Sequence, residues 1–227
     1  MDTASVWKAM FHNSYTLDAL PQSTVDYLEK HTAQLRKGKL LDNGCGSGRL
    51  KKYFEKVGWN CYGIDVSEFA LRAASRESPP NLILGSSDDL PFKDNFFDLV
   101  VSFRVLHNLS EEERSMALIE MERVAKKGAV CLLIVQSRED EKTFNYYRER
   151  GELASSDENT VMVPKDINGK YYSYFRHFFS HIEITDLVAR VAPKFLINNI
   201  EQFHETSGFR KSKPRDQIYW ALTLTKQ

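Results

Sequence analysis

The stretch LLDNGCGSG, residues 40–48, constrains the fold of this chain more than any other segment. A short apolar run leads through Asp42 into three glycines at alternating positions, Gly44, Gly46 and Gly48. Glycine reaches positive φ angles and lets the backbone approach a ligand, because it carries no Cβ. The segment therefore predicts a ligand-binding turn between a strand and a helix.

Strand and helix patterns alternate after this turn, which indicates βαβ units and a mostly parallel sheet. The pattern predicts strands at 39–41, 60–64, 81–85, 98–103, 129–136, 195–203 and 217–225, and helices at 6–12, 23–34, 49–57, 68–76, 111–125 and 182–191. The last two strands are joined by a loop at 205–216, which suits an antiparallel pair at the sheet edge. We therefore expect an α/β, Rossmann-like three-layer sandwich with seven strands, mostly parallel, and an antiparallel edge strand.

The length of 227 residues suits one domain with insertions. We expect residues 1–37 to form an N-terminal helical cap. Residues 138–180 interrupt the alternation and are rich in aromatic side chains, which predicts an inserted lid over a substrate. Its aromatic residues are Phe144, Tyr146, Tyr147, Tyr171, Tyr172, Tyr174, Phe175, Phe178 and Phe179.

Charge and cysteine content exclude several classes of protein. Thirty-one basic and thirty-one acidic residues cancel, so no overall field attracts nucleic acid or membrane. Cys45, Cys61 and Cys131 are far apart and form no CxxC pair, which argues against a disulfide framework and a metal site. No run reaches the roughly 18 apolar residues of a membrane span, and no signal peptide is visible. A cytoplasmic protein is expected.

The glycine turn does not fit a dinucleotide. That fold requires G-x-G-x-x-G or A, and Arg49 occupies the third position here. Asp42 is also badly placed beside a pyrophosphate but would suit a cation. Asp65 ends the second predicted strand, where a carboxylate can accept hydrogen bonds from a ribose. A ligand with a ribose, an ammonium group and no phosphate fits best.

Four segments together resemble the class I S-adenosylmethionine-dependent methyltransferases. They are Asp42-x-Gly44-x-Gly46-x-Gly48, Gly63-Ile-Asp65-Val-Ser67, Asp89-Leu-Pro-Phe92 and Phe97-Asp-Leu-Val-Val-Ser102. The resemblance covers residues 39–136. The motifs are similar to those of the small-molecule and quinone C-methyltransferase branch. It implies a chain that binds S-adenosyl-L-methionine, transfers its methyl group and releases S-adenosyl-L-homocysteine.

The resemblance also implies roles for individual residues. The turn from Gly44 to Gly48 would hold the methionine part of the cofactor, with Asp42 near its ammonium group. Asp65 would bind both ribose hydroxyls, and Val66 would pack on the adenine. Ser102, at the end of the fourth strand, is assigned to the same cofactor site.

The third-strand segment departs from the family pattern. Relatives commonly have Gly-Asp-Ala, whose Asp meets the adenine amino group, whereas this chain has Gly85-Ser86-Ser87-Asp88. A hydroxyl of Ser86 or Ser87, or the carboxylate of Asp88, is expected to make the contact. The alternative is that Asp88 only forms a turn.

Methyl transfer from S-adenosylmethionine requires little from the protein beyond alignment of the acceptor and exclusion of water. His107 follows the fourth strand, where relatives often have Val-Leu-His-His-Leu. It is the catalytic candidate, as a base or as a donor that orients the substrate; the alternative is a structural histidine. Arg104 would bind an acidic substrate or form a surface salt bridge. The Asn-Pro-Pro-Tyr motif of nucleic-acid N-methylating enzymes is absent, which argues against base amino groups as acceptors.

The lid and the last loop supply the remaining candidates. Tyr172, Arg176 and His177 could line an acceptor pocket, and the alternative is an aromatic core packed under the lid. A basic cluster in the loop could contact RNA phosphates, or could be a solvated hairpin loop. It consists of Arg210, Lys211, Lys213 and Arg215.

Three functions therefore remain open at this stage. A methyltransferase with a small-molecule acceptor is favoured, and a tRNA or protein methyltransferase is the alternative. A non-catalytic S-adenosylmethionine-binding interaction protein is kept open by Ser86 and Asn108, which replace family residues. The sequence specifies neither the acceptor atom nor an oligomeric state.

Overall fold

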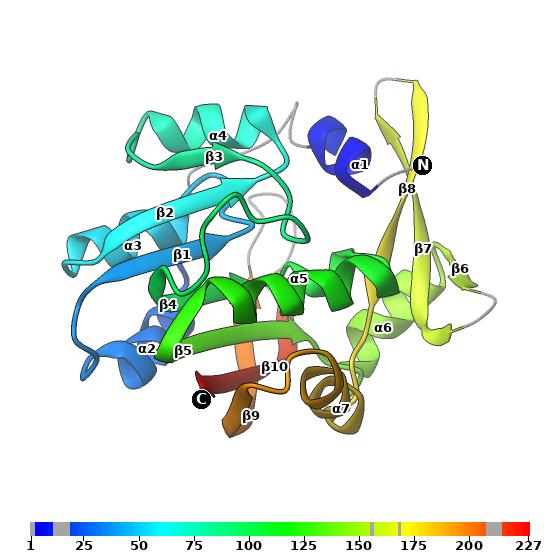
Figure 1. Cartoon of the computed structure of the whole chain (residues 1–227). Coiled ribbons are helices and arrows are strands. Elements are labelled where there is room, and N and C mark those ends of the chain that lie inside the picture. The colour runs from blue at the N-terminus through cyan, green and yellow to red at the C-terminus, as the bar shows by residue number, and fades with distance from the viewer. Residues whose placement is uncertain (1–2, 11–18, 155–156, 168, 208–214) are drawn as a thin grey trace.

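Seven strands form the main sheet, in the order β3-β2-β1-β4-β5-β10-β9 (Figure 1). The computed structural model describes residues 3–10, 19–154, 157–167, 169–207 and 215–227. The strands are β1 (Lys39–Asn43), β2 (Asn60–Asp65), β3 (Leu82–Leu84), β4 (Phe97–Phe103), β5 (Ala125–Gln136), β9 (Phe195–Ser207) and β10 (Arg215–Lys226). Neighbours from β3 to β5 are parallel, and β10 is antiparallel to both β5 and β9.

The predicted fold class is confirmed, with one refinement at the edge. The antiparallel strand β10 lies one position inside the sheet, and β9 is the edge strand. The apolar residues of β10 explain this place, because Ala221, Leu222 and Leu224 are fully buried between the two helical layers. The carboxyl ends of β1, β2 and β4 meet at one edge, where ligands bind in open parallel sheets.

Helices cover both faces of the sheet (Figure 1). They are α2 (Gln22–Thr32), α3 (Arg49–Lys56), α4 (Glu68–Ser75), α5 (Glu111–Val124) and α7 (His181–Val191). One core cluster contains Leu118 of α5 and Ile184 of α7, and another contains Leu28 of α2 and Phe54 of α3. This arrangement is the predicted three-layer sandwich.

A second, smaller sheet lies beside the main one. It has three antiparallel strands, β6 (Glu152–Ala154), β7 (Asp157–Ile167) and β8 (Lys170–His177), accompanied by α6 (Glu141–Arg148) and α1 (Thr3–Met10). Its own core consists of Val6, Phe144, Val161, Val163, Tyr174 and Phe178. Part of the aromatic segment, including Phe144, Tyr174 and Phe178, thus forms a packed core, which was the alternative to residues that line an acceptor pocket.

The division into a helical cap and a lid stays a prediction. Helix α1 packs against β8 of the second sheet, whereas α2 packs against β9 of the main sheet, so the two N-terminal helices contact different parts of the molecule. Residues 11–18, which include the end of the first predicted helix, lie outside the described residues. The three cysteines are buried and unpaired. Among the described helices, none is long and apolar enough to cross a membrane.

Candidate functional site

The glycine turn follows β1 and is fixed by hydrogen bonds to β2. The backbone N–H groups of Gly44 and Cys45 both donate to the Ile64 carbonyl oxygen at 2.9 Å. Gly44, Gly46 and Gly48 have φ angles of +74°, +53° and +78°. A Cβ on Gly44 would lie 2.3 Å from Cγ2 of Val105, whereas a Cβ on Gly46 would meet nothing within 4 Å. Gly44 is therefore needed for packing, and Gly46 borders open space.

Asp42 is buried, with only 1% of its surface exposed. Its Oδ2 accepts the backbone N–H of Lys51 at 3.0 Å, and its Oδ1 has no hydrogen-bond partner among the described residues. Burial raises the pKa of Asp42 to about 7, and the negative charge of Asp65 adds to this effect. A cation placed at the free oxygen would favour the ionised carboxylate.

Asp65 ends β2 and connects two parts of the site. Its Oδ1 accepts the Ser67 backbone N–H at 2.8 Å, and its Oδ2 accepts that of Gly46 at 2.9 Å. Burial raises the pKa of Asp65, although these backbone N–H groups act in the opposite direction. Each carboxylate oxygen has a second lone pair, so the group can still accept hydrogen bonds from a ligand.

Several polar atoms around the turn are buried without hydrogen-bond partners in the described part of the chain. They are both side-chain atoms of Asn43, the hydroxyls of Ser47 and Ser102, and Oδ1 of Asn108. A buried polar group left unpaired costs about 1–3 kcal/mol. Together with Asp42 they form a set of donors and acceptors that suits the ammonium and carboxylate of an amino acid.

His107 lies in a short 3-10 helix, η2 (Leu106–Asn108), directly after β4. Its ring is 1% exposed, and its Nδ1 accepts the backbone N–H of Gln136 at 3.0 Å. The pKa of His107 lies well below its usual value because of burial first, and then because of the positive charges of Arg176 and Arg104. The ring is therefore neutral, with its proton on Nε2. In this state Nε2 is a donor and not a base.

A family model described as a methyltransferase domain matches residues 41–133, which include the glycine turn, Asp65 and His107. A solved S-adenosylmethionine-dependent methyltransferase from Methanosarcina mazei has the same fold, with a TM-score of 0.70 at 22% identity. The match covers 92% of this chain and 99% of the Methanosarcina chain. The matched residues form a methyltransferase domain, and the chain has the fold of the class I S-adenosylmethionine-dependent methyltransferases.

The names of two relatives of this methyltransferase give different acceptors. A tRNA (carboxymethyluridine(34)-5-O)-methyltransferase of Arabidopsis thaliana is 33% identical over 109 residues, which are 46% of this chain and 25% of that protein. An ajmaline N-methyltransferase of Rauvolfia serpentina is 30% identical over 109 residues, 44% of this chain and 37% of that protein. The chain spans less than two thirds of the length of these relatives, so the likeness does not extend to an acceptor.

The adenine side of the methyltransferase site lies at the end of β3. The Gly85 N–H donates to the Asp65 carbonyl oxygen at 3.1 Å, which brings the following turn next to the end of β2. Ser86 Oγ donates to Oδ1 of Asp88, and Ser87 is buried. Two of the three side chains expected to replace the missing Asp, Ser86 and Asp88, are thus paired with each other. Their role toward adenine stays a prediction.

Arg104 is half-buried and forms an ion pair with a buried carboxylate. Its Nη1 lies 2.6 Å from Oε2 of Glu205, which is 2% exposed, and Oε1 of Glu205 accepts the Thr24 hydroxyl at 2.8 Å. Arg104 also has a φ of +65°, a conformation that is unusual for a residue with a Cβ. The pair connects the end of β4 with β9 and α2.

The three lid candidates lie in different surroundings. Tyr172 is half-buried and its ring stacks under the ammonium group of Lys170. His177 is fully buried; its Nδ1 lies 3.0 Å from Asp157, and its Nε2 lies 2.8 Å from Glu183. His177 thus connects β7, β8 and α7, an arrangement that serves structure. Arg176 lies on β8, which packs against η2, the short helix that carries His107.

Three residues of the site, Asn43, Ser47 and Glu205, were not predicted from the sequence. Asn43 and Ser47 lie inside the glycine motif itself, and a polar residue at the end of a buried strand is a signal that could have found Asn43. Glu205 gives no local signal, because its partner Arg104 is 101 residues away. In the basic cluster, Arg210, Lys211 and Lys213 lie outside the described residues, as does the side chain of Arg215.

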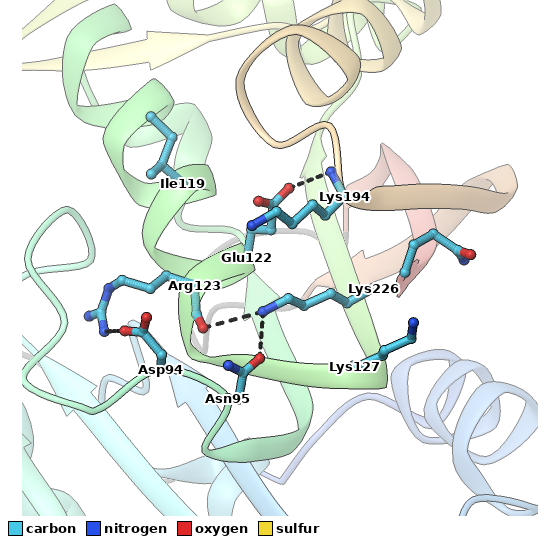
Figure 2. Close-up of a pocket in the computed structure, with 9 residues that line it drawn as sticks. Asp94, Asn95, Ile119, Glu122, Arg123, Lys127, Lys194 and Lys226 are labelled. Atoms are coloured by element: carbon cyan, nitrogen blue, oxygen red, sulfur yellow. Dashed lines mark hydrogen bonds and ion pairs between the residues drawn. The ribbon is translucent and has the colours of Figure 1, made fainter.

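A cavity of about 490 Å³ lies at the opposite edge of the sheet (Figure 2). Nζ of Lys226 points into it and donates to Oδ1 of Asn95 at 2.9 Å, and Arg123 forms an ion pair with Asp94 at 2.8 Å. The lining residues precede β4 and β9, lie at the start of β5, or lie toward the ends of α5 and β10. This cavity is therefore on the side away from the glycine turn.

Proposed function

We propose that this methyltransferase transfers the methyl group of S-adenosyl-L-methionine to a small-molecule acceptor. The observation that carries the cofactor assignment is the set of buried, unpartnered polar atoms beside the open flank of Gly46, at the carboxyl ends of β1 and β4. A set that contains donors and acceptors fits the amino-acid end of the cofactor. Its sulfonium supplies an activated methyl group when the cofactor is bound.

Each part of the cofactor has proposed partners in the chain. Asp42 would hold the ammonium group, because its free Oδ1 is buried beside the turn. Asn43 and Ser102 would hold the carboxylate, to which both can donate hydrogen bonds. Asp65 would accept the ribose hydroxyls, and Val66 would contact the adenine. The protein would thereby fix the direction from which an acceptor approaches.

A small acceptor is favoured because the part of the site around His107 and Ser102 is enclosed. His107 and Ser102 are buried, and the second sheet packs over η2 through β8. Water is thus kept away from the place where the methyl group is transferred. A small molecule can be enclosed there, whereas a base within an RNA strand would require the second sheet to move.

A second candidate function is methylation of tRNA. It is favoured by the 33% identity to the Arabidopsis tRNA methyltransferase and by the basic residues at 210–215 of the sequence. It also predicts binding that weakens steeply with salt, because phosphate contacts release counterions. A non-catalytic role is a third candidate, in which the chain binds the cofactor without turnover.

One assay separates the three candidates. The protein is incubated with methyl-labelled S-adenosylmethionine and either deproteinised metabolites or total RNA, with Asp65→Ala as the control for loss of cofactor binding. Label in the metabolite fraction alone supports the proposal. Label in RNA alone would overturn it in favour of the tRNA candidate. Cofactor binding without transfer to either fraction would favour the non-catalytic role.

A further inference from the structure

In the part of the chain that the structure describes, Arg176 has no acidic partner. Among the described residues, no carboxylate lies within ion-pair distance of its guanidinium group, and its Nε is buried without a hydrogen bond. Its contacts are aromatic. Nη2 lies 3.4 Å from the hydroxyl of Tyr147, and its central carbon lies 4.9 Å and 5.9 Å from the ring centres of Tyr147 and Tyr174.

Two other cations near His107, Arg104 and His177, have acidic partners. Arg104 is paired with the buried Glu205 at 2.6 Å. His177 lies between Asp157 and Glu183, and these two carboxylates also act on the buried Arg114. Arg114 likewise forms no ion pair among the described residues, and its Nε and Nη1 are buried without hydrogen bonds. Arg114 is only 6% exposed, however, whereas Arg176 is half-buried and can meet a ligand.

Arg176 is also close to the proposed transfer point. Helix η2, which carries His107, packs against β8, which carries Arg176. The charge of Arg176 is the strongest of the neighbouring charges that lower the pKa of His107. Arg176 also acts on Tyr219, whose ring centre lies 6.4 Å from that of His107. Residues of η2, α6, β8 and β10 thus place a guanidinium, an imidazole N–H and tyrosine rings close together.

We infer that the methyl acceptor carries a carboxylate, and that Arg176 binds this group beside His107. The inference rests on the proposed function and specifies its substrate class. The planar guanidinium can hold both carboxylate oxygens at once. Tyr147 and Tyr174 would provide apolar walls for the part of the acceptor next to the carboxylate.

The first test identifies the charge of the acceptor. A deproteinised cell extract is separated on an anion exchanger at pH 8, and each fraction is offered to the protein with labelled S-adenosylmethionine. The inference predicts that the acceptor is retained by the exchanger and survives treatment with phosphatase. An acceptor in the flow-through, or one destroyed by phosphatase, would overturn it and leave the proposed function intact. Absence of any labelled product would count against the proposed function and the inference together.

The second test does not depend on turnover. Phenylacetate and its neutral counterpart phenylacetamide are titrated into the protein with bound S-adenosylhomocysteine. We expect phenylacetate to bind at least about 10-fold more tightly, since hydrogen bonds to a charged group contribute about 1.5–3 kcal/mol. Equal affinity for the two probes, or no binding of phenylacetate, would contradict the inference.

Variants of Arg176 show whether this side chain is responsible for the results of both tests. Arg176→Gln is expected to abolish the preference for phenylacetate and to lower kcat/KM for the retained acceptor roughly 10- to 100-fold. Arg176→Lys keeps the charge and is expected to restore part of the preference. Arg190→Gln changes an exposed arginine of α7 and serves as the matched control. Unchanged affinity for S-adenosylhomocysteine shows that each variant is folded. An Arg176→Gln variant that keeps the preference would refute the assignment.

Discussion

Oδ2 of Asp65 accepts the backbone N–H of Gly46 at 2.9 Å, so the end of β2 is joined directly to the glycine turn after β1. The same turn is held by two hydrogen bonds to the Ile64 carbonyl oxygen. These three bonds order the turn within the protein itself. A cofactor would therefore meet a site whose backbone is already arranged, which lowers the entropy lost on binding.

Gly46→Ala tests whether the open space beside the turn belongs to the cofactor. A Cβ at Gly46 meets no protein atom within 4 Å, so the fold loses only the cost of a positive φ, about 1–2 kcal/mol. Gly128→Ala is the matched control, because Gly128 also has a positive φ and open surroundings far from the site. We expect similar losses of unfolding free energy in both variants, measured by urea denaturation. Only Gly46→Ala is expected to weaken S-adenosylmethionine binding, by at least about 10-fold. Equal cofactor affinity in the two variants would show that the space is not used.

Asp42→Asn is expected to stabilise the free protein above neutral pH. The pKa of Asp42 is raised to about 7 by burial, so the folded state holds a proton between about pH 4 and pH 7 that the unfolded state has lost. Wild-type stability therefore falls as the pH rises through this range and is level above it. Because one pKa unit corresponds to about 1.4 kcal/mol, the variant should be roughly 2–4 kcal/mol more stable than wild type at pH 8. The difference in unfolding free energy between variant and wild type should disappear toward pH 4. Denaturation at several pH values measures this difference.

The same substitution has the opposite effect on the cofactor. Binding of an ammonium group favours the ionised Asp42, so wild-type affinity for S-adenosylmethionine should rise with pH up to about 7. The charges of Asp65, Lys51 and Arg49 also act on this carboxyl group, and they are unchanged in the variant. Asp42→Asn should bind more weakly at pH 8 and show a flat pH profile. Calorimetry showing wild-type affinity in the variant at pH 8 would contradict this role.

His107→Asn separates a donor from a base. The oxygen of an asparagine can take the place of Nδ1 as acceptor for the Gln136 N–H. We expect this variant to keep most of the stability, whereas His107→Ala leaves that N–H unpaired and loses about 1–3 kcal/mol. Because the pKa of His107 is far below its usual value, activity should show no titration of this group between pH 6 and 8. A wild-type rate profile with a limb in that range, absent in His107→Asn, would show that His107 acts as a base.

The main sheet and the cofactor side of the site could be predicted because their signals are local. The turn from Gly44 to Gly48, the acidic end of β2 and the alternation of strands and helices each lie within a few residues of one another. Parallel strands then bring their carboxyl ends to one edge by geometry alone. The sequence therefore predicts the positions of Asp42 and Asp65 next to the turn without knowledge of distant contacts.

The second sheet and the acceptor corner could not be predicted in the same way. Strands β6 to β8 are exposed on much of both faces, so they lack the regular alternation of a half-buried strand. The Asn-Gly pair at 168–169 is a hairpin signal that was available in the sequence. The pairing of Arg104 with Glu205, and the absence of an acidic partner for Arg176, depend on residues far apart along the chain. No local pattern encodes such relationships.

Calorimetric titration of S-adenosylmethionine tests the central claim most directly. The protein should bind one equivalent of the cofactor, and Asp65→Ala should bind at least about 10-fold more weakly, because it loses the carboxylate proposed to hold the ribose. Asp186→Ala, at an exposed position of α7, is the control and should bind like wild type. A folded wild-type protein that binds no S-adenosylmethionine at millimolar concentration would contradict the account.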